Sequence, residues 1–136
     1  MPINIRFVHV NMLDGWPGDG VPRVEVIWQI QSVFRKYSHP HVYMSLAGIG
    51  RASTFAAIQM AHERLHEDCY SIASPCDCVT SIREQRMHSI QSLQHAATVH
   101  AVMVQHIVDC PKYEKTSVER SHTFMSQYNK NCHIVQ

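Results

Sequence analysis

The stretch HVYMSLAGIGR, residues 41–51, decides which fold the chain is expected to adopt. Its β-branched and aromatic beginning predicts a short strand over residues 41–44, and the glycines that follow predict a loop over 45–51. A helix is then predicted by apolar residues at helical spacing, namely Phe55, Ile58, Ala61 and Leu65. The order of strand, glycine loop and helix predicts an α/β fold, in which helices pack on a mixed sheet.

The loop in this stretch has features of an anion-binding site. Backbone N–H groups without helical partners gather at the start of a helix, where the helix dipole also favours negative charge. Arg51, at the end of the loop, would add a bidentate fork for two phosphate oxygens. A tight strand-to-helix turn with an exposed arginine would give the same pattern, so the spacing alone leaves both interpretations open.

Residue patterns predict further elements on both sides of this stretch. Partial alternation of apolar residues predicts a strand over residues 4–12, and clustered Gly, Pro and Asp predict a loop over 14–22. Helices are predicted by apolar spacing over residues 23–37, 79–86 and 90–108. Beyond Cys110 the sequence is polar and has no periodic pattern. We therefore predict one domain over residues 1–110 and a mobile tail over residues 111–136.

Composition excludes several classes of partner. The 136 residues carry a formal net charge of +1, so no global field attracts nucleic acid or an anionic membrane, and we predict neither as a partner. No apolar run reaches the length of a membrane span, and the first twenty residues lack the order of a signal peptide. Five unevenly spaced cysteines predict free thiols in a reducing compartment, so we predict a cytoplasmic protein.

A short segment contains four residues of the types that bind zinc, which are His66, Cys69, Cys76 and Cys78. Their spacing lacks the paired C-x-x-C arrangement of a strong zinc motif. We therefore predict no metal and no cofactor.

Three motifs, in this order along the chain, resemble the tyrosine-specific protein phosphatases. Residues 16–22, WPGDGVP, resemble the acid loop W-P-D-x-G-V-P of that family. Residues 41–51 resemble its signature loop, VHCSAGxGR. Residues Arg83 to Gln94 resemble the run R-x-Q-R-x-x-x-V-Q-T-x-x-Q, which carries a water-positioning glutamine. The resemblance covers residues from about 4 to 108 and corresponds to the second half of such a domain. It implies an α/β domain, truncated at its N-terminal side.

The resemblance also implies roles for individual residues. Ser45 stands at the position of the nucleophilic cysteine, and Gly18 at that of the acid aspartate, with Asp19 as a candidate substitute acid. Gln91 stands at the water-positioning glutamine. The implied phosphate-binding residues are Leu46, Ala47, Gly48, Ile49, Gly50 and Arg51.

The substitutions remove the chemical groups and keep the binding groups. A helix start can ionise a thiol, whereas the hydroxyl of Ser45 would need an adjacent general base, and Met44 provides none. We therefore predict a catalytically inactive module that binds phosphotyrosine proteins or another protein partner. Two alternatives are a phosphatase with residual activity that depends on Asp19, and a truncated family remnant without a working pocket.

Overall fold

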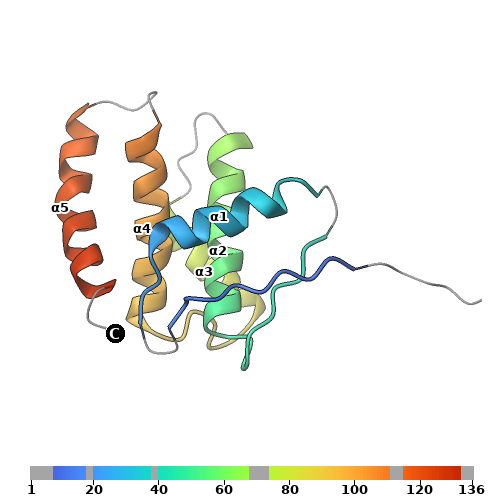
Figure 1. Cartoon of the computed structure of the whole chain (residues 1–136). Coiled ribbons are helices and arrows are strands. Elements are labelled where there is room, and N and C mark those ends of the chain that lie inside the picture. Colours follow the sequence, from blue (N-terminus) through green and yellow to red (C-terminus); the bar gives the residue numbers. More distant parts are fainter. Residues whose placement is uncertain (1–7, 18–19, 38–39, 68–73, 111–114, 133–136) are drawn as a thin grey trace, which may run out of the picture.

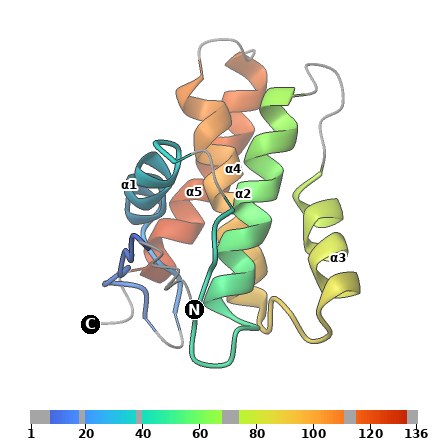
Figure 2. The same cartoon turned by 90° about the vertical axis from the view of Figure 1, so that its right-hand side faces the viewer.

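Five helices make up the regular structure of the described residues. The computed structural model describes residues 8–17, 20–37, 40–67, 74–110 and 115–132. The helices are α1 (Val24–Phe34), α2 (Arg51–Glu67), α3 (Pro75–Gln85), α4 (Leu93–Asp109) and α5 (Lys115–Cys132). Helix α4 contacts the other four helices. In Figure 1, α4 and α5 stand side by side and α1 runs across their direction. Figure 2 shows α3 flanking α2 on the side away from α1.

Local sequence signals explain where α3 and α4 begin. Ser74 is the N-cap of α3 and accepts a hydrogen bond from Cys76 N at 3.2 Å, and Pro75 occupies the first helical position. The expected helix over residues 79–86 therefore begins four residues earlier than predicted. Ser92 caps α4 in the same way by accepting from His95 N.

The predicted α/β fold is wrong, because no strand forms within the described residues. The described parts of the two expected strands run as irregular chain (Figure 1). Apolar side chains that a sheet would cover are open to solvent, with exposed fractions of 79% for Val8, 85% for Val10, 78% for Val42 and 88% for Met44. A strand needs a neighbouring strand for its backbone hydrogen bonds and a packing partner for its apolar face. Among the described residues, these two segments have neither.

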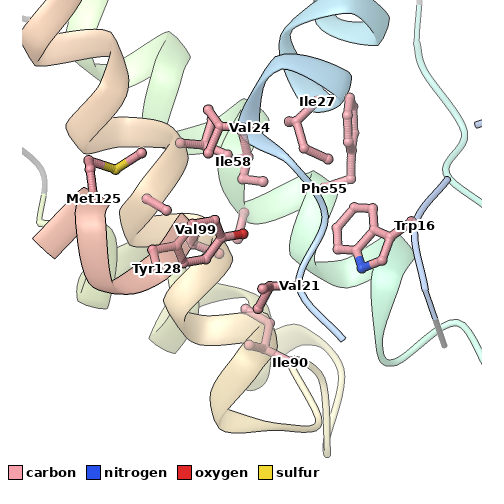
Figure 3. Packing of buried hydrophobic residues seen from close by; sticks show 13 residues of the cluster. Trp16, Val21, Val24, Ile27, Phe55, Ile58, Ile90, Val99, Met125 and Tyr128 are labelled. Atoms are coloured by element: carbon pink, nitrogen blue, oxygen red, sulfur yellow. The ribbon is translucent and has the colours of Figure 1, made fainter. Parts of the chain in front are cut away.

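A single large apolar cluster joins four of the helices with the connecting segments (Figure 3). Its members include Val24 and Ile27 of α1, Phe55 and Ile58 of α2, Val99 of α4, and Met125 and Tyr128 of α5. Trp16, Val21 and Ile90 from the connecting segments also belong to the cluster. Through this core, the start of α2 and the segment around Trp16 pack against α1, α4 and α5.

Residues 115–132, for which the composition predicts a mobile tail, form helix α5 in the structure. Met125 and Tyr128 are 7% and 4% exposed. The Tyr128 hydroxyl donates to the Pro22 carbonyl oxygen at 2.9 Å, and it lies 3.2 Å from the Thr98 hydroxyl oxygen. Phe124, Met125 and Tyr128 form a narrow apolar stripe on one side of an otherwise polar helix, which explains why composition alone predicts a tail.

Candidate anion-binding loop

The loop before α2 makes a tight turn that requires glycine at position 48. Gly48 N donates to Ser45 O at 3.2 Å, and Gly48 has a φ of +70°, in the left-handed region that glycine adopts without strain. A Cβ at this position would also lie 2.9 Å from Arg86 Nη2. The guanidinium of Arg86 therefore lies against the loop. Arg83 is an exposed residue of α3.

The loop leaves several backbone donors open at the start of a 17-residue helix. Within the described residues, the amide groups of Leu46, Ala47, Ile49 and Gly50 donate to no acceptor. Ser45 Oγ accepts a hydrogen bond from Ala52 N at 3.4 Å, so the hydroxyl at the expected nucleophile position caps the helix. Open N–H groups and the positive end of the helix dipole together favour an anion at this loop.

Arg51 begins α2 and links the loop to the segment around Trp16. Its Nη1 donates to the Trp16 carbonyl oxygen at 3.2 Å, and Trp16 is 6% exposed. The structure therefore brings together one end of the motif at residues 16–22 and the arginine of the loop. Gly18 and Asp19, the expected acid position and its substitute, lie outside the described residues.

The segment between α3 and α4 is hydrogen-bonded to the loop, because Ile90 N donates to Ile49 O at 2.7 Å. A second bond to the loop comes from α2, where Ser53 Oγ donates to Gly48 O at 2.7 Å. Ile90 has a φ of +58°, a conformation that is strained for a β-branched residue, and it is buried at 4% exposure. Burial and the bond to Ile49 hold this backbone in place. The next residue, Gln91, lies close to Gly50, with Oε1 3.7 Å from the position of a Cβ there.

His95 is a member of the site that sequence reasoning missed. Its Cε1 lies 3.1 Å from the Cβ position at Gly50, and its Nδ1 is 2.9 Å from Ser92 Oγ. Burial, and after it the charge of Arg51, lowers the pKa of His95 below its ordinary value. In the family run R-x-Q-R-x-x-x-V-Q-T-x-x-Q, the last glutamine stands four residues after the water-positioning one, and His95 occupies that place. Gln94, assigned to it, is one residue early and exposed.

An apolar cavity of about 400 Å³ opens beside the loop. Ser45 and Arg51 line it together with the aromatic residues Trp16, Phe34, Tyr43 and Phe55 and several aliphatic side chains. Burial, with a smaller contribution from Glu63, raises the pKa of Tyr43 to about 12. The cavity therefore combines one cation with a mainly apolar wall.

Protonation of His95 is expected to destabilise the fold in mild acid. Its folded-state pKa lies below the unfolded value of 6.5, so the unfolded chain binds the proton more readily. The stability that this difference provides is complete above pH 6.5 and is lost as the pH falls through that value and the lower folded pKa. Urea unfolding of His95→Gln at a series of pH values should show a smaller loss below pH 6.5 than the parent chain. The exposed variant His122→Gln should keep the full loss; equal curves for all three chains would contradict the assignment.

Comparison with known proteins identifies the family. Residues 4–105 match the family model for protein-tyrosine phosphatase. The chain belongs to the protein-tyrosine phosphatase family. It is similar to the receptor-type tyrosine-protein phosphatase alpha of Homo sapiens and to that of Mus musculus, with 29% identity over 99 residues in each case. These alignments cover 68% of this chain and 12% of each relative, so the chain spans a small part of their length. No solved structure matches the chain.

Two further predictions concern metals and membranes. Across the described residues, no group of three or more His, Cys, Asp or Glu side chains could hold a metal ion. Of the four residues considered as zinc ligands, Cys76 is exposed and Cys78 is buried, while Cys69 and the side chain of His66 lie outside the described part.

Among the helices described, none has both the length and the apolar character to cross a membrane.

Proposed function

We propose that this chain is a catalytically inactive phosphatase-family module that binds phosphotyrosine-bearing proteins at the loop Leu46–Arg51. The observation that carries the proposal is the set of four open amide donors beside Arg51 at the start of α2. A phosphate dianion offers the acceptors that such donors lack. The aromatic wall of the adjoining cavity supports a phosphorylated ring as the ligand in preference to a short phosphorylated side chain.

The arrangement around Ser45 supports binding without turnover. Its hydroxyl oxygen accepts from Ala52 N, and neighbouring Met44 carries no base and is 88% exposed. A serine nucleophile needs an adjacent general base, and no histidine, carboxylate or lysine contacts Ser45 among the described hydrogen bonds. Gly18, at the acid position, has no side chain to donate a proton to a leaving group.

Calorimetric titration of the full chain with a phosphotyrosine peptide tests this proposal, provided that released phosphate is assayed in the same samples. We expect saturable binding, no binding of the unphosphorylated peptide, and no phosphate release. Phosphate release that disappears in Asp19→Asn would instead support a phosphatase with residual activity. Absence of binding together with non-cooperative unfolding in urea would support the truncated remnant.

Restoring the thiol alone is not expected to restore catalysis. Ser45→Cys supplies the nucleophile, but Gly18 still lacks the general acid, which is typically worth about 10² to 10⁴ in rate. We expect phosphate release from a phosphotyrosine peptide to stay at the level of the parent chain. Ser45→Ala serves as the matched control and should bind the peptide about as well as the parent. Robust hydrolysis by Ser45→Cys would contradict the assignment of Gly18 as the missing acid.

A further inference from the structure

A second pair of reactive side chains lies on α3 and α4, outside the loop. Cys76, the second residue of α3, is exposed, and its Sγ lies 3.5 Å from Nε2 of His100 on α4. The two residues are far apart in sequence and come together because α3 packs on α4. A thiol beside an imidazole nitrogen is a nucleophile with a base in reach.

The hydrogen bond on the other side of the imidazole fixes the role of His100. Its Nδ1 lies 2.9 Å from the carbonyl oxygen of Ala96. A carbonyl oxygen can only accept, so Nδ1 carries the proton and the neutral ring presents the lone pair of Nε2. Nε2 therefore faces the sulfur of Cys76 as an acceptor. Nucleophile, base and orienting group stand in the order that activated nucleophiles use.

The start of α3 adds to this arrangement at the sulfur. Ser74 Oγ accepts from Cys76 N, which fixes Cys76 in the first turn of the helix. Helix starts favour negative charge, including that of a thiolate. Asp77, the next residue, is exposed and would repel an anionic reagent, so an uncharged reagent suits the site better.

We propose that Cys76 and His100 form a nucleophilic dyad that makes Cys76 a site of reversible modification by small, uncharged disulfides. His100 Nε2 takes the thiol proton as Cys76 Sγ attacks one sulfur of the disulfide. The S–S bond of the reagent breaks, a mixed disulfide forms at Cys76, and the leaving thiolate takes the proton from His100. The exchange consumes one disulfide and releases one thiol, so no external oxidant is needed.

Two other described cysteines provide internal comparisons. Cys78 is buried, and desolvation raises the pKa of its thiol, so it should react slowly. Cys110 is partly exposed at the end of α4, and no histidine nitrogen contacts its sulfur among the described residues. Cys110 therefore reports the reactivity of a surface thiol without the dyad.

Reaction of the full chain with dithiodipyridine, a neutral aromatic disulfide, tests the proposal. Samples are quenched with acid at successive times, and each mixed disulfide is quantified by peptide mass spectrometry. We expect Cys76 to react about tenfold faster than Cys110, a smaller factor than the 10² or more that a base gives inside an enzyme site. In urea the two rates should become similar, because the dyad depends on the packing of α3 on α4. A Cys76 rate in the folded chain that is no greater than that of Cys110 would overturn the proposal.

The variant His100→Gln separates the dyad from exposure alone. Glutamine keeps a polar side chain at this position but cannot act as a base, so the Cys76 rate should fall about tenfold while the Cys110 rate stays unchanged. An unchanged Cys76 rate would show that exposure alone explains its reactivity and would overturn the proposal. If the variant unfolds, buried Cys78 becomes reactive, and the comparison of folded and urea-treated parent chain decides the question. Phosphotyrosine binding at the loop does not enter any of these measurements.

Discussion

Replacement of Arg51 by alanine is expected to lower the affinity for a phosphotyrosine peptide about a hundredfold or more. In the proposed complex the guanidinium would donate two charge-assisted hydrogen bonds to phosphate, and each such bond contributes about 1.5 kcal/mol or more. The open amides of Leu46 to Gly50 remain in this variant, so residual affinity reports what they contribute. Calorimetric titration of the variant beside the parent chain measures the difference.

Arg83→Ala is the matched control, because it removes the same charge from an exposed position on α3. Its affinity should stay within a few-fold of the parent value. Arg51→Lys keeps the charge but loses the planar fork, so its affinity should fall between those of the parent and Arg51→Ala. Equal affinities of the parent chain and Arg51→Ala would contradict the assignment of the loop as the binding site, whatever affinity the control Arg83→Ala shows.

Replacement of Met125 by aspartate is expected to lower the free energy of unfolding by about 3–5 kcal/mol. Met125 is 7% exposed in the main cluster, and an unpaired charge buried there has no compensating partner. The short aspartate side chain also cannot reach solvent as a lysine could. Such a loss is a large fraction of the stability of an ordinary domain. Urea unfolding followed by circular dichroism measures it.

Gln127→Asp provides the comparison on the same helix. Gln127 is exposed, so aspartate there lowers the helix propensity about as much as it does at position 125, but buries no charge. Its free energy of unfolding should lie within about 1 kcal/mol of the parent value. If Met125→Asp were as stable as Gln127→Asp, residues 115–132 would behave as the tail that their composition predicts.

Periodic apolar residues predicted helices well, because a helix is specified by neighbours three and four positions apart. Ile27 and Ile30 place α1, and Phe55, Ile58 and Ala61 place α2. The first residue of a helix was predicted less accurately where a capping side chain determines it. The predicted helix over residues 90–108 included Ile90, but the cap at Ser92 begins α4 later and leaves Ile90 in the left-handed region.

The prediction of a sheet was wrong, because a local pattern of this kind cannot show whether a strand finds partners. Valine and methionine at alternating positions show that a segment suits a sheet, but a sheet also needs strands supplied from elsewhere in the chain. Within the described residues, Val42 and Met44 find no such strand. Of the expected order of strand, loop and helix, the loop and the helix therefore form, and the strand over residues 41–44 does not.

The motif at residues 41–51 predicts a loop that opens a helix, and α2 begins at Arg51. Gln91 lies beside Gly50. The roles of these residues in binding phosphate stay predictions. His95 was missed because a lone histidine on a helix gives no sign of the direction in which it points. Counting four residues from Gln91 would have singled it out.

The bond from Ile90 N to Ile49 O has a consequence for how the loop opens. Ile49 belongs to the loop, whereas Ile90 belongs to the connection between α3 and α4, and this bond ties them together. Any fluctuation that lifts the loop away must break this bond, and the left-handed backbone at Ile90 is then free to relax. Loop and connection therefore open as one cooperative unit, and an anion that holds the loop closed also protects a peptide group some forty residues further along the chain.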